Sequence, residues 1–246
     1  MNKEIESLLI QNGASMVGFA RIEDLYSWQN SNEPQSADST KEQIVLPKYK
    51  IGIAIGLKYP KNVIRGISNN PTEEYYNYYH QLNEKLNELA ILCAGYIDKK
   101  GYNAYAQTTS AIAEYGVFRT AMPHKTVAVN AGLGWIGKSA LFVTAEYGSA
   151  IRITSVLTDA PLAYNKSLPE SKCGGCMLCT NACPGKAISG KNWSEKLDRD
   201  EYYDAMACRV KARELSLQYL NKQITLCGKC IEVCPYTRKY LAVVGE

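Results

Sequence analysis

The stretch Cys173-Gly-Gly-Cys-Met-Leu-Cys-Thr-Asn-Ala-Cys-Pro184 places four cysteines within twelve residues. Its spacing, C-x2-C-x2-C-x3-C-P, is the ligand run of bacterial ferredoxins. There the first three thiolates bind one [4Fe–4S] cluster and the fourth binds a second cluster. A looser copy follows, with Cys208 and then Cys227-x2-Cys230-x3-Cys234-Pro235. The small residues between the ligands allow the backbone to wrap closely around a cluster.

The ferredoxin pattern sorts eight of the cysteines into two sets of four. The first set is Cys173, Cys176, Cys179 and Cys234, and the second set is Cys183, Cys208, Cys227 and Cys230. In this interpretation Cys208 replaces the first cysteine of a second run, displaced by residues 209–226, which we expect to be helical. Two zinc sites are the alternative, because four thiolates also bind zinc. Zinc sites usually pair two C-x2-C knuckles, so the triple run favours two iron–sulfur clusters.

The composition is that of a soluble globular protein. The 246 residues are 46% hydrophobic and 21% charged, and the net charge of +4 is dispersed without a basic run. This charge pattern predicts no nucleic-acid or membrane surface. The N-terminus lacks the apolar core of a signal peptide, and no membrane-spanning run follows. We therefore expect a cytoplasmic protein whose clustered thiols bind metal and do not form disulfides.

The region before the cysteines mixes helix and strand patterns. Strands are expected over residues 15–20, 51–59 and 150–158, helices over residues 3–12 and from Thr72 to Gly101, and a surface loop over residues 30–43. The long helix carries one apolar face, formed by Leu82, Leu86, Leu89, Cys93 and Ile97. Cys93 on that face is predicted to be a buried core thiol. The composition changes near residue 165. We therefore predict an α+β protein with an α/β domain over residues 1–164 and a ferredoxin-like domain over residues 165–246.

A glycine-rich stretch, Asn-Ala-Gly-Leu-Gly-Trp-Ile-Gly-Lys-Ser-Ala over residues 130–140, matches two nucleotide motifs. It fits both G-x-G-x-x-G and G-x-x-x-x-G-K-[ST]. Both motifs require a strand before the loop and a helix after it. The flanking residues predict neither, and the large Trp135 would lie inside a phosphate cradle. A tight glycine turn that packs Trp135 into the core is the competing interpretation.

The sequence resembles the epoxyqueuosine reductase family and its shorter relatives, which are related to the reductive dehalogenases. The resemblance lies in AGLGWIGKSALFVTAEYG (131–148), TSVLTDAPL (154–162) and the double cysteine run, and upstream in NGASMVGFA (12–20) and IGIAIGLKY (51–59). It implies an N-terminal domain that binds a corrinoid (cobalamin) and a ferredoxin-like domain that feeds electrons to it. The residues that the resemblance places near the corrinoid are Gly132, Gly134, Trp135, Gly137, Lys138 and Ser139.

Two departures from the family pattern bear on the reaction. The reductases carry an acidic proton donor in a D-[TS]-x-P segment, whereas the corresponding residues here are Thr120-Ala121-Met122-Pro123-His124-Lys125. The sequence stops twelve residues after Cys234, so we expect it to lack the tRNA-binding helical repeats that close the full-length reductases of this family. We therefore expect no action on tRNA. His124 is the candidate catalytic proton donor, and Glu114, Tyr115 and Asp159 are weaker candidates.

The sequence thus predicts an oxidoreductase that passes electrons through two [4Fe–4S] clusters to cobalamin. An external donor of the ferredoxin or flavodoxin type would supply the electrons, and a small molecule or a partner redox protein would receive them. Three alternatives stay open. The protein is an electron carrier or reductive activator for a partner, a reductase with a flavin in place of the corrinoid, or a zinc-stabilised binding module.

Overall fold

The computed structural model describes residues 1–23, 25, 49–109, 120, 122–168 and 170–243. The surface loop predicted over residues 30–43 lies outside the described residues, as do Glu114 and Tyr115. The chain divides into two compact units, each assembled from three segments. The first unit comprises Met1–Gly56, Leu86–Leu133 and Ile153–Ser167, and the second comprises Leu57–Lys85, Gly134–Arg152 and Leu168–Glu246.

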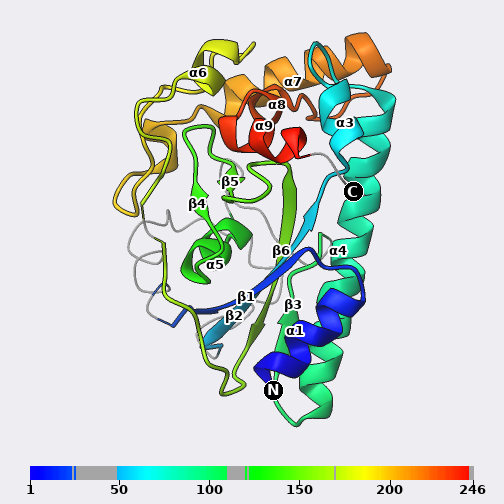
Figure 1. Cartoon of the computed structure of the whole chain (residues 1–246), viewed down its shortest axis with the longest axis vertical. Coiled ribbons are helices and arrows are strands. Elements are labelled where there is room, and N and C mark those ends of the chain that lie inside the picture. The colour runs from blue at the N-terminus through cyan, green and yellow to red at the C-terminus, as the bar shows by residue number, and fades with distance from the viewer. Residues whose placement is uncertain (24, 26–48, 110–119, 121, 169, 244–246) are drawn as a thin grey trace, which may run out of the picture. The chain divides into compact units, whose positions relative to one another are not determined.

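A four-stranded sheet, most of which belongs to the first unit, has the order β1-β2-β6-β3 (Figure 1). The strands are β1 (Met16–Arg21), β2 (Ile51–Lys58), β3 (Ala104–Ala106) and β6 (Ile151–Thr158). β1 pairs with β2 and β3 pairs with β6, both antiparallel. β2 reads IGIAIGLK and is buried at every position before Lys58, as befits an apolar strand between two neighbours. The predicted strands at 15–20, 51–59 and 150–158 are therefore confirmed.

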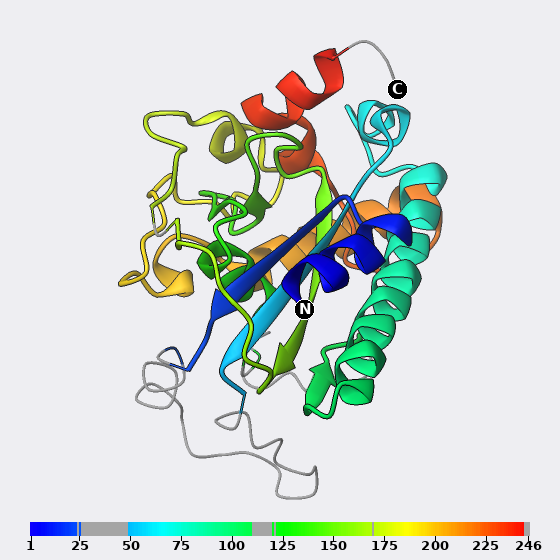
Figure 2. The same cartoon turned by 60° about the horizontal axis from the view of Figure 1, so that its bottom comes forward.

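Helices bury their apolar faces in the first unit. α1 (Asn2–Gln11) buries Ile5 and Leu9 and lies along β1 (Figure 2). α5 (His124–Asn130) also packs against β1. α4 (Glu73–Lys99) begins just after Thr72, as predicted. Within this unit its predicted apolar face is buried at Leu86, Leu89, Cys93 and Ile97. α5 was not predicted from the sequence, because several of its central residues are β-branched and therefore poor helix formers.

The second unit contains a two-stranded hairpin and short helices. The hairpin pairs β4 (Trp135–Ile136) with β5 (Phe142–Val143). The helices are α3 (Lys61–Gly66), α6 (Leu178–Ala182), the 3-10 turn η2 (Arg199–Glu201), α7 (Ala205–Leu220), α8 (Lys229–Glu232) and α9 (Pro235–Ala242). The segment 209–226, predicted to be helical, forms α7 up to Leu220, and its last six residues lie outside the helix. α7 begins earlier than expected because the Asp204 side chain caps it, accepting a hydrogen bond of 2.8 Å from the Ala207 N–H.

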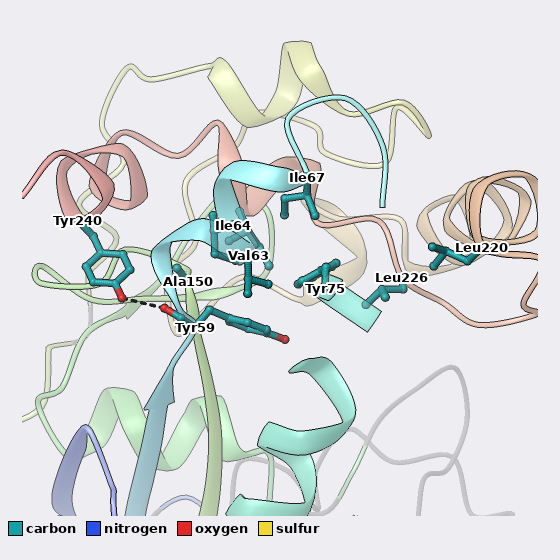
Figure 3. Packing of buried hydrophobic residues seen from close by; sticks show 10 residues of the cluster. Tyr59, Val63, Ile64, Ile67, Tyr75, Ala150, Leu220, Leu226 and Tyr240 are labelled. Atoms are coloured by element: carbon teal, nitrogen blue, oxygen red, sulfur yellow. Dashed lines mark hydrogen bonds between the residues drawn. The ribbon is translucent and has the colours of Figure 1, made fainter. Parts of the chain in front are cut away.

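An apolar cluster forms the core of the second unit (Figure 3). Its buried members are Tyr59, Val63, Ile64, Ile67, Tyr75, Ala150, Leu220, Leu226, Ile231 and Tyr240. The Tyr240 hydroxyl donates to the Tyr59 carbonyl oxygen at 2.7 Å. Residues far upstream of the cysteines thus share a core with the cysteine-bearing segment. The domain boundary proposed near residue 164 stays a prediction. No helix in the described part of the chain has the length and apolarity needed to cross a bilayer.

Candidate metal centre

Helices and turns of the second unit position the eight clustered cysteines. Cys173 lies in a turn, Cys179 lies in α6, and Cys183 is the C-cap of α6. Cys208 lies in α7 and Cys230 in α8. Cys234 is the N-cap of α9, where Pro235 occupies the first helical position, which suits a residue without an N–H. All eight side chains are partly buried.

Four of the thiols gather as the first predicted set. Burial raises the pKa of the Cys179 thiol, and the neighbouring thiols of Cys173, Cys234 and Cys176 raise it further. Such effects require charges that lie close together. The structure therefore brings Cys234 to three cysteines that precede it by more than fifty residues in the sequence.

The remaining four thiols also lie together. Burial raises the pKa of Cys208, a side-chain hydrogen bond with Tyr203 lowers it, and the thiol of Cys183 raises it. The pKa of Cys227 is raised first by burial and then, among other causes, by the thiols of Cys208 and Cys183. Burial raises the pKa of Cys230 well above its usual value, and the thiols of Cys227, Cys208, Cys179 and Cys183 add to this. Cys230 thus lies near both sets. Tyr203 was not identified from the sequence, which offers no signal for a hydroxyl beside a thiol.

Backbone amides point toward several of these sulfurs, as cluster ligands require. The Ala187 N–H donates to Cys183 Sγ at 3.4 Å. Amides of Thr180 and Lys229 donate to Cys179 and Cys227 and lower the pKa values of those two thiols. No three His, Cys, Asp or Glu side chains in the described residues converge closely enough to hold a single metal ion.

Five of the thiols line a cavity of about 40 Å³. Cys173, Cys176, Cys179, Cys230 and Cys234 form part of its wall, together with Val143, Pro235, Tyr236 and three residues of the glycine-rich stretch, Gly137, Lys138 and Ser139. Thiols that surround a space in this way suit a polynuclear cluster, because a single zinc ion holds four sulfurs at only about 2.3 Å. The donor set and the amides therefore fit an iron–sulfur cluster.

The glycine-rich stretch forms the hairpin β4–β5 and contains neither of the strand–loop–helix arrangements that its nucleotide motifs require. Trp135 pairs with Val143, and its side chain is 1% exposed. The Trp135 ring meets the Tyr236 ring edge-to-face at 4.8 Å, so the interpretation of a glycine turn that packs Trp135 into a core is confirmed. A Cβ on Gly134 would lie 2.2 Å from the Val143 carbonyl oxygen.

The six residues proposed to contact a corrinoid fall into both units. Gly132 belongs to the first unit, and a Cβ there would lie 2.6 Å from the Lys166 carbonyl oxygen. Gly134, Trp135, Gly137, Lys138 and Ser139 belong to the second unit. At Gly132 and Gly134 the protein's own backbone makes the close approach that glycine permits. Corrinoid contact by these residues stays a prediction.

The candidate proton donor His124 is the first residue of α5 in the first unit. Its Nδ1 lies 2.8 Å from the hydroxyl of Ser155, which also accepts a hydrogen bond of 2.6 Å from the Gln107 side-chain amide. Ser155 is fully buried, so this chain of polar groups fixes the imidazole ring. Asp159 accepts two hydrogen bonds from Asn103, at 2.8 and 2.6 Å, and these hold it in a turn.

Comparisons with known proteins agree with this geometry. Residues 172–237 match the 4Fe-4S double cluster binding domain. The chain is 25% identical to the epoxyqueuosine reductase of Lactococcus garvieae over 97% of its own length and 70% of the relative's. A crystal structure of epoxyqueuosine reductase with a tRNA stem loop has a TM-score of 0.59 at 20% identity, covering 96% of this chain. A reductive dehalogenase studied for B12-dependent dehalogenation has a TM-score of 0.70 at 18% identity, covering 95% of this chain.

The chain spans only part of most of these proteins. It covers 65% of the solved reductase and 31% of the solved dehalogenase. In three further epoxyqueuosine reductases the shared region is 41%, 52% and 29% of the relative's length. The two solved structures, at identities of 20% and 18%, establish a shared fold.

Proposed function

We propose that this iron–sulfur redox protein, a homologue of the epoxyqueuosine reductases that is also related to the reductive dehalogenases, relays single electrons through two [4Fe–4S] clusters to a bound corrinoid, cobalamin. The observation that supports the proposal is the cavity lined by five of the eight thiols, within the region that matches the 4Fe-4S double cluster binding domain. The clusters supply one-electron transfer, and cobalamin supplies a strongly reducing cobalt.

The residues of this chain have defined tasks in the proposal. Cys173, Cys176, Cys179 and Cys234 hold one cluster, and Cys183, Cys208, Cys227 and Cys230 hold the other. Backbone amides that donate to the sulfurs stabilise the negative charge of each cluster. Cys230 lines the same cavity as the four cysteines of the first set, so in this proposal the two clusters adjoin and an electron crosses a short distance between them. An external ferredoxin or flavodoxin supplies the electrons.

The corrinoid and the substrate rest on the resemblance to known proteins. The fold is that of a dehalogenase studied for B12-dependent chemistry, and the glycine-rich stretch adjoins the cluster ligands. Residues 120–125 contain no carboxylate, so His124, oriented by Ser155, donates the proton. We propose a small molecule or a partner redox protein as the acceptor, in place of the tRNA stem loop present in one solved epoxyqueuosine reductase.

Iron analysis of the anaerobically reconstituted protein tests the ligand sets. We expect about eight iron atoms per chain. Cys176→Ala and Cys230→Ala each remove one ligand from a different set and should each leave about four. Cys93→Ala is the matched control, since Cys93 is buried in the first unit, and it should retain about eight. Equal iron content in Cys176→Ala and the wild type would contradict the assignment.

Absorption spectra recorded with added cobalamin and with added flavin mononucleotide test the second cofactor. Saturable changes in the cobalamin spectrum with the anaerobic, cluster-loaded protein support the proposal. Binding of the flavin alone supports the flavin reductase, and binding of neither supports the electron carrier. A colourless protein that contains zinc and no iron would overturn the whole redox assignment.

A further inference from the structure

Lys138 presents a buried positive charge beside the cysteines. It lies at the tip of the β4–β5 hairpin, within the turn closed by the hydrogen bond of 2.9 Å from the Gly137 N–H to the Leu141 carbonyl oxygen. The residue is only 3% exposed. Its hydrogen-bond partner in the described part of the chain is Met177 Sδ, 3.6 Å from Nζ. A thioether is a weak, neutral acceptor, so it does not balance the ammonium charge.

A buried ammonium requires an anion nearby, because desolvation strongly disfavours an isolated charge. No carboxylate pairs with Lys138 among the residues that the structure describes. Lys138 instead lines the cavity that Cys173, Cys176, Cys179 and Cys234 also line. Gly137 brings the hairpin tip to this wall, since a Cβ there would lie 3.5 Å from Cys173 Sγ.

Four thiolates on a cubane core of charge about +2 give a cluster of net charge about −2, which becomes about −3 on reduction. Such a group is the anion that the buried lysine lacks. A positive charge in a site of low dielectric stabilises the more negative, reduced form more than the oxidised form. The reduction potential of a neighbouring cluster therefore rises.

We propose that Lys138 is the buried counter-ion of the cluster held by Cys173, Cys176, Cys179 and Cys234, and that its charge raises the reduction potential of that cluster. The inference rests on the proposed function for the cluster's location. It also explains why a G-x-x-x-x-G-K-S sequence occurs without the fold of a phosphate loop. The lysine faces an anion, as it does in a phosphate loop, but the anion is the cluster.

Redox titration of the two clusters, followed by electron paramagnetic resonance, tests this role. Lys138→Met removes the charge and keeps an unbranched side chain, whereas Lys138→Arg keeps the charge. We call the cluster held by Cys173, Cys176, Cys179 and Cys234 the first cluster. At the midpoint potential of the wild-type protein, Lys138→Met should lower the ratio of reduced to oxidised first cluster about tenfold. This corresponds to a decrease of ~59 mV in the reduction potential for one electron. Lys138→Arg should change the ratio less than about threefold. The Cys176→Ala spectrum identifies which signal belongs to this cluster.

Lys172→Met is the matched control, because Lys172 is exposed and adjoins Cys173 in the sequence. Solvent screens its charge, so its effect on the ratio should be smaller than that of Lys138→Met. An unchanged potential in Lys138→Met with about eight irons bound would overturn the inference.

Loss of the first cluster from Lys138→Met but not from Lys138→Arg would support the inference, since charge and not packing then retains the cluster. Loss from both variants would overturn it. A wild-type protein that binds no clusters would refute the proposed function itself, and iron analysis distinguishes that outcome from the others.

Discussion

The first unit buries a four-stranded sheet beneath helices, whereas the cysteine-bearing segment of the second unit contains one long helix, α7, together with short helices and irregular backbone. In the first unit, Ile53, Ala54 and Ile55 of β2 are completely buried. In the second, α6 has five residues, none of them buried, and α8 has four. Helices this short are unstable alone. Apolar burial therefore stabilises the sheet. We expect the conformation around α6 and α8 to depend on ligation of the cysteines, although Ile231 of α8 also contributes to the apolar core.

The largest expected effect is the loss of structure in one region when iron is removed. Chelation under reducing, anaerobic conditions should abolish the hydrogen-exchange protection of amides in α6 and α8. The amides that pair β1 with β2 should keep theirs, because their hydrogen bonds are formed within the sheet. Exchange measured by mass spectrometry before and after chelation checks this. Equal loss in both regions would show that the two regions unfold together.

The free thiol of the first unit should react far more slowly than an exposed thiol. Burial raises the pKa of Cys93 to about 12, so only ~10⁻⁴ of it is ionised at pH 8, against ~0.2 for an ordinary thiol. We expect alkylation by iodoacetamide to be on the order of 10³-fold slower in the native protein than in guanidinium chloride. Peptide mapping checks this. Since the raised pKa favours the neutral thiol, Cys93 adds stability below pH 9 that diminishes as the pH rises toward 12.

Truncation of the sheet core should lower stability without loss of iron. Ile55→Ala in β2 removes a completely buried side chain and should reduce the free energy of unfolding by about 2–5 kcal/mol. Ile91→Ala on α4 is the control, because Ile91 is 60% exposed, and it should change stability by less than ~0.5 kcal/mol. Urea unfolding followed by circular dichroism measures both variants. Loss of iron from the Ile55→Ala variant while it is still folded would show that the sheet also supports the cysteine site.

Glycine-to-alanine substitutions in the two units should change the free energy of unfolding in opposite directions. Gly148 has a φ of +58°, and a Cβ there would lie 2.1 Å from the Thr237 backbone nitrogen. Gly148→Ala should therefore reduce stability by about 1–3 kcal/mol. Gly95 lies inside α4, and the methyl group of an alanine there would have no neighbouring atom within 4 Å, so Gly95→Ala should add about 0.5–1 kcal/mol. Thermal unfolding compares the two, and destabilisation by Gly95→Ala would contradict the packing described for α4.

Regular elements with strong local patterns were predicted well. The strand over β2 and the apolar face of α4 follow from runs of side chains whose periods match strand and helix. α5 and the hairpin β4–β5 were missed, since neither is long enough to show a period. The short strand β3 (Ala104–Ala106) pairs with β6, some fifty residues away in the sequence. The residues of β3 alone do not predict that pairing.

Ligand spacing is a local property, and the sequence by itself therefore determined the two cysteine runs, which lie within the region that matches the 4Fe-4S double cluster binding domain. The division of the eight cysteines into two sets of four stays a prediction. Only the tertiary structure decided which other residues face those thiols. The hairpin tip meets Met177, 39 residues away in the sequence, and buries Lys138 beside the cysteine cavity. Burial and charge pairing depend on such distant contacts, because desolvation acts wherever the fold excludes water and does not depend on which residues are neighbours in the sequence.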